Sequence, residues 1–279
     1  MKYSIIICKP QGYKHQGVFY EVAELIYFGF KKLNYDCIIT THFNIPDRRQ
    51  IVLGANLLQS TNIILREDSI ILNLERAGHD EQFSENYCTL LRKYEVWDFS
   101  WLNIDRINRR YNLKINKCIQ LGYTEELNRI NLKEFKDRDI DILFCGSLSN
   151  KRKAILDEMF NLNLKIVHLF GVYGKTRDEY ISRSKLLLNL HYHEFGNLEQ
   201  VRIFYYLSNQ CAVLSEKSDD NNENKDFENM IFLSDYKDIP KKALDLIKNN
   251  SEIELKSSQG FKHFKEKKIE DNLRNILIN

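Results

Sequence analysis

The sequence predicts an α/β protein built from two doubly wound parallel sheets, and three observations lead to this fold class. The chain has 279 residues, which suits two compact domains better than one. Short apolar runs typical of buried parallel strands alternate with segments that carry apolar residues at helical spacing. The alternation stops once, at the polar stretch 124–138, and then starts again.

The first series of elements covers residues 1–123. The apolar run Tyr3–Cys8 predicts a buried strand that ends in the turn 9–13. Residues 17–33 follow with apolar side chains at helical spacing. The other elements expected here are strands at 37–41, 51–53, 70–74, 95–98 and 117–121, and helices at 85–93 and 104–111.

The second series begins after the stretch 124–138, which we expect to be the linker between the domains. The polar stretch 216–229 is expected to be a loop. The boundaries predict domains at 1–123 and 139–260, followed by a C-terminal helix at 261–279 that could pack back across the domains. The elements expected here are strands at 140–145, 165–170, 186–190, 212–215 and 230–233, and helices at 151–160, 177–184, 198–207, 239–249 and 261–277.

The composition excludes several classes of protein. Hydrophobic residues make up 43% and charged residues 29%, as in an ordinary globular protein. The net charge of only +2 argues against nucleic acid as a partner, because counterion release requires a concentrated basic face. No apolar stretch approaches the roughly 20 residues of a membrane helix, and the first residues do not resemble a signal peptide. We therefore expect a cytoplasmic protein whose contact with membranes is at most peripheral.

The cysteines and histidines do not predict a metal site. The six cysteines include no CxxC pair, so we expect buried thiols rather than disulfides. His191 and His193 could bind a metal only with a third ligand, which the spacing does not provide. The alternative is a pair of histidines at a strand end with no ligand. Asp139 and Asp141 lie at the start of a strand, so they do not form a metal-binding DxD motif.

Signals for an anion site follow the expected strand 140–145. Gly146 and Ser147 form a small-residue turn, and Arg152 and Lys153 stand near the start of the next helix. Backbone N–H groups, the helix dipole and a guanidinium fork all favour a bound anion there. The glycine spacing fits neither a Walker A loop nor a GxGxxG fingerprint. An ordinary turn before a solvated basic helix is the alternative.

Two more expected strand ends carry turns of this kind. Gly171 and Tyr173 follow one of them, where Tyr173 could stack on a flat heterocycle or pack internally. Glu199 and Arg202 lie three residues apart in the first turn of a helix and so share one face. Arg202 and the helix amides would hold a diphosphate, while Glu199 would accept hydrogen bonds from a ribose diol. The alternative is a carboxylate that only satisfies the helix dipole.

These segments resemble a known family when they are taken together and in order. They are DIDILFCGSLSNKRKAIL (139–156), LFGVYGKTRDEYISRSKLLLNLHYHE (169–194) and LEQVRIFYYLSNQCAVLSE (198–216). The run is similar to the donor-binding domain of GT-B glycosyltransferases, a group with poorly characterised bacterial and viral members. The first half is compatible with the same group through QGYKHQGVFYEVAELI (11–26), IVLGANLL (51–58), LNLERA (72–77) and YEVWDFSWLNIDRI (94–107).

The resemblance implies two Rossmann-like doubly wound domains facing a cleft, which is the GT-B architecture. In that family a glutamate at the place of Glu199 contacts the nucleotide ribose, and basic residues at the place of Arg152 or Lys153 neutralise the diphosphate. Many retaining members carry two glutamates separated by seven residues, whereas Glu194 precedes Glu199 by only five. The stereochemical outcome therefore stays open. The candidates for donor binding are Gly146, Ser147, Arg152, Lys153, Gly171, Tyr173, His191, Glu199 and Arg202.

We therefore expect a hexosyl- or pentosyltransferase that uses a nucleotide sugar and a glycan or other hydroxyl acceptor, with no metal or other cofactor. Arg152, Lys153, Arg202 and helix N-termini would stabilise the departing phosphate. The alternative is a non-catalytic nucleotide- or carbohydrate-binding module of the same fold. An epimerase-type doubly wound enzyme is disfavoured by the missing GxGxxG.

An inverting enzyme also needs a general base from the first domain. Glu75, which follows the expected strand 70–74, and His15, in the first strand–helix turn, are the candidates. The alternatives are a surface carboxylate and a solvated loop histidine. Trp97 and Asp98 form another strand end, and we expect the tryptophan to pack in the core.

Overall fold

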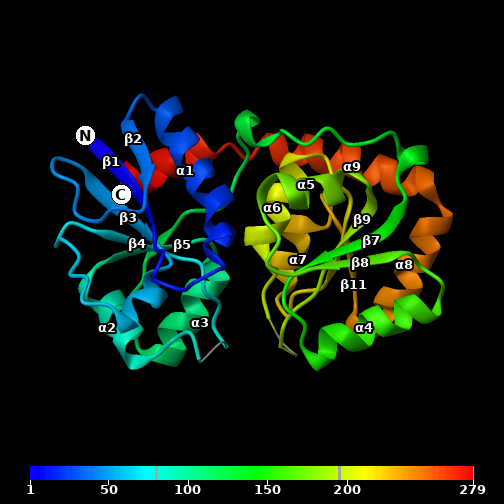
Figure 1. Cartoon of the computed structure of the whole chain (residues 1–279), viewed down its shortest axis with the longest axis horizontal. Coiled ribbons are helices and arrows are strands. Elements are labelled where there is room, and N and C mark those ends of the chain that lie inside the picture. The colour runs from blue at the N-terminus through cyan, green and yellow to red at the C-terminus, as the bar shows by residue number, and fades with distance from the viewer. Residues whose placement is uncertain (79–80, 194–195, 279) are drawn as a thin grey trace. The chain divides into compact units, whose positions relative to one another are not determined.

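The structure is a computed structural model that describes residues 1–78, 81–193 and 196–278. The chain divides into two compact units (Figure 1). The first unit comprises Met1–Thr124 and Lys268–Asn279, and the second comprises Glu125–Lys267. The chain therefore passes from one unit to the other twice.

The first unit is built on a six-stranded sheet in which all neighbouring strands are parallel, in the order β2-β1-β3-β4-β5-β6. Strand β1 is buried from its second residue to its last, as expected for a strand covered on both faces. The strands are β1 Lys2–Ile7, β2 Asp36–Thr40, β3 Arg49–Leu53, β4 Ile70–Asn73, β5 Glu95–Asp98 and β6 Lys117–Cys118. The helices are η1 Gln16–Phe19, α1 Tyr20–Lys32, η2 Ala55–Ser60, α2 Glu85–Lys93, α3 Trp101–Tyr111 and α10 Ile269–Ile278.

The second unit is built on a five-stranded parallel sheet in the order β11-β10-β9-β7-β8. Its strands are β7 Ile140–Cys145, β8 Ile166–Leu169, β9 Ser184–Asn189, β10 Val213–Glu216 and β11 Phe232–Ser234. Its helices are η3 Glu125–Leu127, η4 Phe135–Asp137, α4 Asn150–Asn161, α5 Gly174–Ser182, α6 Gln200–Ser208, α7 Asn221–Phe227, η5 Tyr236–Asp238, α8 Ile239–Lys248 and α9 Asn250–Lys265.

Side-chain caps begin several of the helices. Ser84, Ser100 and Ser149 each accept a hydrogen bond from the backbone N–H three residues later, at the starts of α2, α3 and α4. Such a cap satisfies one of the N–H groups that the first turn leaves unpaired. Asp220 caps α7 in the same way.

The predicted fold class is confirmed, since both sheets are parallel and alternate with helices. Two local predictions are wrong. The stretch 216–229, expected to be a loop, contains α7, because the carboxylate of Asp220 accepts from Asn222 N and Glu223 N. The helix expected at 261–277 is interrupted between α9 and α10, where Ile269 N donates to Tyr123 O instead of continuing the helix.

The stretch 124–138, expected to be the linker, groups with the second unit from Glu125 onwards. Arg129 N and Ile130 N both donate to Asn209 Oδ1, and Lys133 N donates to Ser182 O. The six cysteines are free thiols, and the prediction that they are buried holds for four of them, whereas Cys118 and Cys145 are half-buried. Within the described residues, none of the helices has both the length and the apolar character that a membrane crossing needs.

Helix α10 completes the first unit by packing against α1, where the red and blue helices of Figure 1 lie together. Leu273 of α10 is fully buried. Gly29 lies on the buried side of α1 and makes the approach possible, because a Cβ placed there would lie 2.5 Å from Leu273 Cδ1. The two helices can therefore lie this close together because Gly29 has no side chain.

Replacing Gly29 by Ala tests this contact. We expect the free energy of unfolding to fall by about 1–3 kcal/mol from overpacking, despite the better helix propensity of alanine. Urea unfolding measures the change. In a Leu273→Ala background the nearest obstruction is gone and only Ile269, with Cγ2 at 3.1 Å and Cγ1 at 3.2 Å from the added Cβ, still has to yield. The same substitution should therefore cost less there than in the parent. A single Gly29→Ala variant that is more stable than the parent would contradict the close packing.

Candidate functional site

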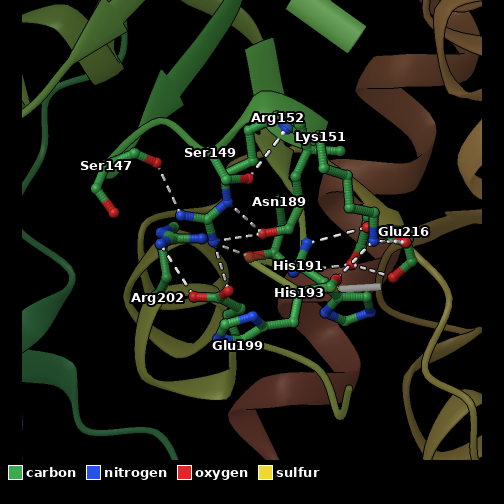
Figure 2. A network of polar contacts seen from close by, with 12 residues as sticks. Ser147, Ser149, Lys151, Arg152, Asn189, His191, His193, Glu199, Arg202 and Glu216 are labelled. Carbon is green, nitrogen blue, oxygen red and sulfur yellow. Dashed lines mark hydrogen bonds and ion pairs between the residues drawn. The ribbon is translucent and has the colours of Figure 1, made fainter. Parts of the chain in front are cut away.

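Three neighbouring strands of the second sheet end at one edge. Strands β10, β9 and β7 are adjacent and parallel, so their carboxyl ends lie side by side. The residues that follow or end them are Gly146 after β7, Leu190 after β9 and Glu216 at the end of β10. Figure 2 shows the polar side chains that gather at this edge.

Arg152, in the first turn of α4, is the centre of the network in Figure 2. Its side chain is only 3% exposed, and its guanidinium donates to Ser147 O at 2.9 Å and to Leu190 O at 2.6 Å. It also donates to Glu199 Oε1 at 2.6 Å. The Phe144 ring centroid lies 5.3 Å from the guanidinium carbon. One side chain thus joins the turn after β7, the end of β9 and the start of α6.

Glu199 stands between two arginines. It precedes α6, which begins at Gln200 rather than at the predicted residue 198. Its Oε1 accepts from Arg152, and its Oε2 lies 3.1 Å from Arg202 Nη2. Arg202 Nη1 also donates to Asn189 Oδ1 at 2.8 Å. The two guanidinium groups therefore share one carboxylate, which leaves a net positive charge in the group.

Burial acts to lower the pKa of the Arg202 guanidinium, but the charge of Glu199 outweighs it and holds that pKa above its usual value.

Gly146 allows the arginines to come close to the turn after β7. A Cβ at Gly146 would lie 3.1 Å from Arg202 Nη2 and 3.5 Å from Arg152 Nη1. The backbone φ of +153° there also favours glycine.

A second ion pair fixes the segment that follows β9. Lys151 Nζ donates to Glu216 Oε1 at 2.5 Å and to His193 O at 2.8 Å. The other oxygen of Glu216 accepts from His191 N at 3.0 Å. The His191 ring is buried, and its Nε2 lies 2.9 Å from Lys217 O. Sequence reasoning did not identify Lys151, which begins an expected helix, or Asn189 and Glu216, which stand at or beside expected strand ends.

The structure brings together six of the nine donor-binding candidates: Gly146, Ser147, Arg152, His191, Glu199 and Arg202. Lys153 instead points to solvent and pairs with Asp157 at 2.6 Å. Gly171 and Tyr173 lie in the turn between β8 and α5, at the end of the neighbouring strand. The described residues contain no group of three possible metal ligands. Glu194 lies outside the described residues.

The two candidate bases belong to the first unit. Glu75 is half-buried two residues after β4, and its Oε1 accepts from Asn56 Nδ2 at 3.0 Å. Burial raises the pKa of the Glu75 carboxyl, although the charge of Arg76 and the Asn56 hydrogen bond act in the other direction. His15 precedes η1, and its ring meets the edge of Tyr13 with centroids 5.9 Å apart.

Asp98, which ends β5, is a further buried polar residue that the site prediction missed. It is fully buried, and its carboxylate accepts from Asn73 Nδ2 at 2.6 Å, from Asn103 Nδ2 at 2.9 Å and from Ser100 N at 2.9 Å. Trp97 beside it is buried in the core, as predicted.

Comparison with known proteins shows which fold this is. No protein-family model matches the sequence. "Uncharacterized protein L138" of Acanthamoeba polyphaga mimivirus is 27% identical over 178 residues, which are 59% of this chain and 20% of that protein. The chain spans 20%, 26% and 62% of the length of three curated mimivirus relatives that it matches.

Solved structures match over the whole chain. Anabaena Alr3699/HepE in complex with UDP and glucose has a TM-score of 0.60 at 10% identity, with all of both chains covered. AviGT4, a glycosyltransferase involved in avilamycin A biosynthesis, has a TM-score of 0.58 at 11% identity and covers 100% of this chain and 98% of its own. These structural neighbours are GT-B glycosyltransferases. The chain therefore has the GT-B fold, as the sequence resemblance implied.

The role of the Glu199 carboxylate, which the two arginines share, can be tested by removing it. Glu199→Ala should lower the free energy of unfolding by about 3–5 kcal/mol, because the buried guanidinium of Arg152 would lose its counter-charge. Asp157→Ala is the matched control, since it removes the carboxylate partner of Lys153 on the same helix α4. That pair is exposed, so its loss should cost less than about 0.5 kcal/mol. Equal losses in chemical denaturation would contradict a special role for the buried pair.

Proposed function

We propose that this chain is a glycosyltransferase that moves a hexosyl or pentosyl group from a nucleotide sugar to a hydroxyl of a glycan or other acceptor. The observation that carries the proposal is the pair of arginines, Arg152 and Arg202, gathered at the starts of α4 and α6 around one carboxylate. The GT-B fold supports it, as does the presence of UDP and glucose in the HepE structure.

The charges suit the leaving group of such a reaction. The acceptor oxygen forms a bond to the anomeric carbon while the bond from that carbon to the phosphate oxygen breaks, so negative charge develops on the departing nucleoside diphosphate. Arg202, the more exposed of the two arginines at 19%, would meet this charge, and the dipoles of α4 and α6 would add positive potential at their N-termini. The deeply buried Arg152 holds the turn after β7 and adds to the positive field. Lys153 would contribute only from the surface.

Glu199 has two roles in this proposal. One of its oxygens accepts from Arg152 and the other pairs with Arg202. A carboxylate oxygen can accept more than one hydrogen bond, so Glu199 could also receive one from a ribose diol. Glu199 would thus bind the ribose and hold both guanidinium groups in position. With these cations available, we expect transfer to proceed in EDTA.

The first unit would supply the base for an inverting reaction, and Glu75 is the better of the two candidates. Burial raises its pKa toward the range in which a carboxylate is an effective base near neutral pH. The acceptor hydroxyl would give its proton to this carboxylate. His15 is the second candidate.

Arg202→Gln tests the donor site. UDP is the probe, and isothermal titration calorimetry measures its affinity. Loss of a charge-assisted hydrogen bond of about 1.5–3 kcal/mol should weaken binding about 10–100-fold. Arg183→Gln is the control, since Arg183 is exposed before the first residue of β9 and pairs with Asp139. Its UDP affinity should stay within about twofold of the parent. If no nucleoside monophosphate or diphosphate raises the melting temperature, the donor site is refuted.

Glu75→Gln tests the base. Replacing a general base should lower kcat by about 100–10,000-fold and leave nucleotide affinity unchanged. In the parent, kcat should rise with pH through the raised pKa of Glu75, because the reaction needs the deprotonated form. Glu85→Gln, an exposed carboxylate that pairs with Arg92, should keep full activity. Tight nucleotide binding with no turnover of any sugar nucleotide, with or without an acceptor, would favour the non-catalytic binding module.

A further inference from the structure

The carboxylate of Asp98 organises the loop that carries Glu75. It lies at the carboxyl end of β5, next to the end of β4, and its donors are neutral amides. Its Oδ2 accepts two side-chain amides, one from Asn73 and one from Asn103. Its Oδ1 accepts the backbone N–H of Ser100, which begins α3.

Both asparagines then reach the backbone of Glu75. Asn73 Nδ2 and Asn103 Nδ2 each donate to Glu75 O at 2.9 Å. In return, Asn73 Oδ1 accepts from Glu75 N at 3.2 Å and Asn103 Oδ1 accepts from Ala77 N at 2.9 Å. The short segment after β4 is therefore held at three backbone groups, and every one of these bonds comes from a side chain that Asp98 anchors.

An aspartate suits this position better than its amide would. A carboxylate has acceptor sites only, whereas an asparagine would turn an NH₂ group toward either the two asparagine amides or the Ser100 N–H. Hydrogen bonds to a carboxylate are also about twice as strong as neutral ones. Burial raises the pKa of Asp98 to about 7, while the hydrogen bonds from Asn73, Ser100 and Asn103 act to lower it.

We propose that Asp98 is a positioning residue for the transfer reaction, which fixes the backbone of Glu75 through Asn73 and Asn103. The proposal rests on the role of Glu75 in the proposed function. Asp98 itself has no contact with solvent, so it acts through the two asparagines and touches no substrate. The alternative is that Asp98 only supports the start of α3, and the experiment must distinguish this structural role from the positioning of Glu75.

Asp98→Asn is the test variant, and Ser100→Ala is its matched control. Ser100 neighbours Asp98, and its side chain caps α3 by accepting from Asn103 N at 3.3 Å, without a bond to Glu75. Amide hydrogen exchange followed by NMR on the labelled chain reports the amides of Glu75 and Ala77. In Asp98→Asn their exchange should accelerate at least tenfold relative to the Val52 amide of β3. In Ser100→Ala the ratio should stay unchanged.

Steady-state kinetics provide the second readout. Asp98→Asn should lower kcat about 10–100-fold while KM for the donor stays within about twofold, because the donor site belongs to the second unit. Ser100→Ala should retain the kcat of the parent. If Asp98→Asn does not fold, Asn103→Ala is the second variant, because it removes one of the two asparagines that hold the segment. Amide exchange should then accelerate more at Ala77 than at Glu75, whose N–H still donates to Asn73.

The outcomes separate this inference from the proposed function. Equal acceleration of Glu75 and Ala77 in Asp98→Asn and Ser100→Ala would show that Asp98 only supports α3 and would overturn the inference. Unchanged exchange in Asp98→Asn would overturn it as well. Faster exchange with an unchanged kcat would keep the anchoring of the loop and refute its effect on the reaction. Loss of kcat in Glu75→Gln but not in Asp98→Asn would keep the proposed function and reject the positioning role.

Discussion

The edge of the second sheet where β7, β9 and β10 end depends on one interaction, the ion pair between the buried guanidinium of Arg152 and the carboxylate of Glu199. A charge that is 3% exposed must be matched by acceptors inside the protein. Here they come from two connections: Ser147 O from the turn after β7, and Leu190 O and the carboxylate of Glu199 from the two ends of the segment between β9 and α6. The turn after β7, the end of β9 and the start of α6 cannot move independently without leaving that charge unsatisfied. Arg202 pairs with the same carboxylate, so the side chain of Glu199 contacts both arginines and fixes how they lie relative to each other.

A buried carboxyl group has the corresponding role in the first unit. Asp98 lies at a strand end, and amide N–H groups from β4 and from the start of α3 donate to it. In each sheet a buried ionisable side chain near the carboxyl ends of the strands joins segments that follow neighbouring strands. Parallel sheets place several such connections at one edge, where a single buried side chain can bond to more than one segment.

Periodicity and apolar runs were sufficient to predict both sheets and the helix at 85–93, because burial on both faces leaves a strong pattern. The short helix α7 escaped prediction because six of its seven residues are polar and form no apolar stripe, and only the Asp220 cap indicates it. The choice between Arg152 and Lys153 was available in the sequence. Arg152 precedes Ile155, Leu156 and Met159 at helical spacing and shares their buried face, whereas Lys153 is four residues before the exposed Asp157. The partnership of Arg152 with Glu199, 47 residues away, depends on tertiary structure and has no local signal.

The packing of α10 on α1 also governs the order in which the molecule can be assembled. Every residue of the second unit lies between the two segments of the first, so a ribosome delivers that unit before α10. Until α10 arrives, the side of α1 that carries Gly29 and receives Leu273 stays uncovered. The nascent chain therefore carries an unfinished apolar surface on α1 while the inserted unit is made, and the first unit closes only after α10 has been synthesised.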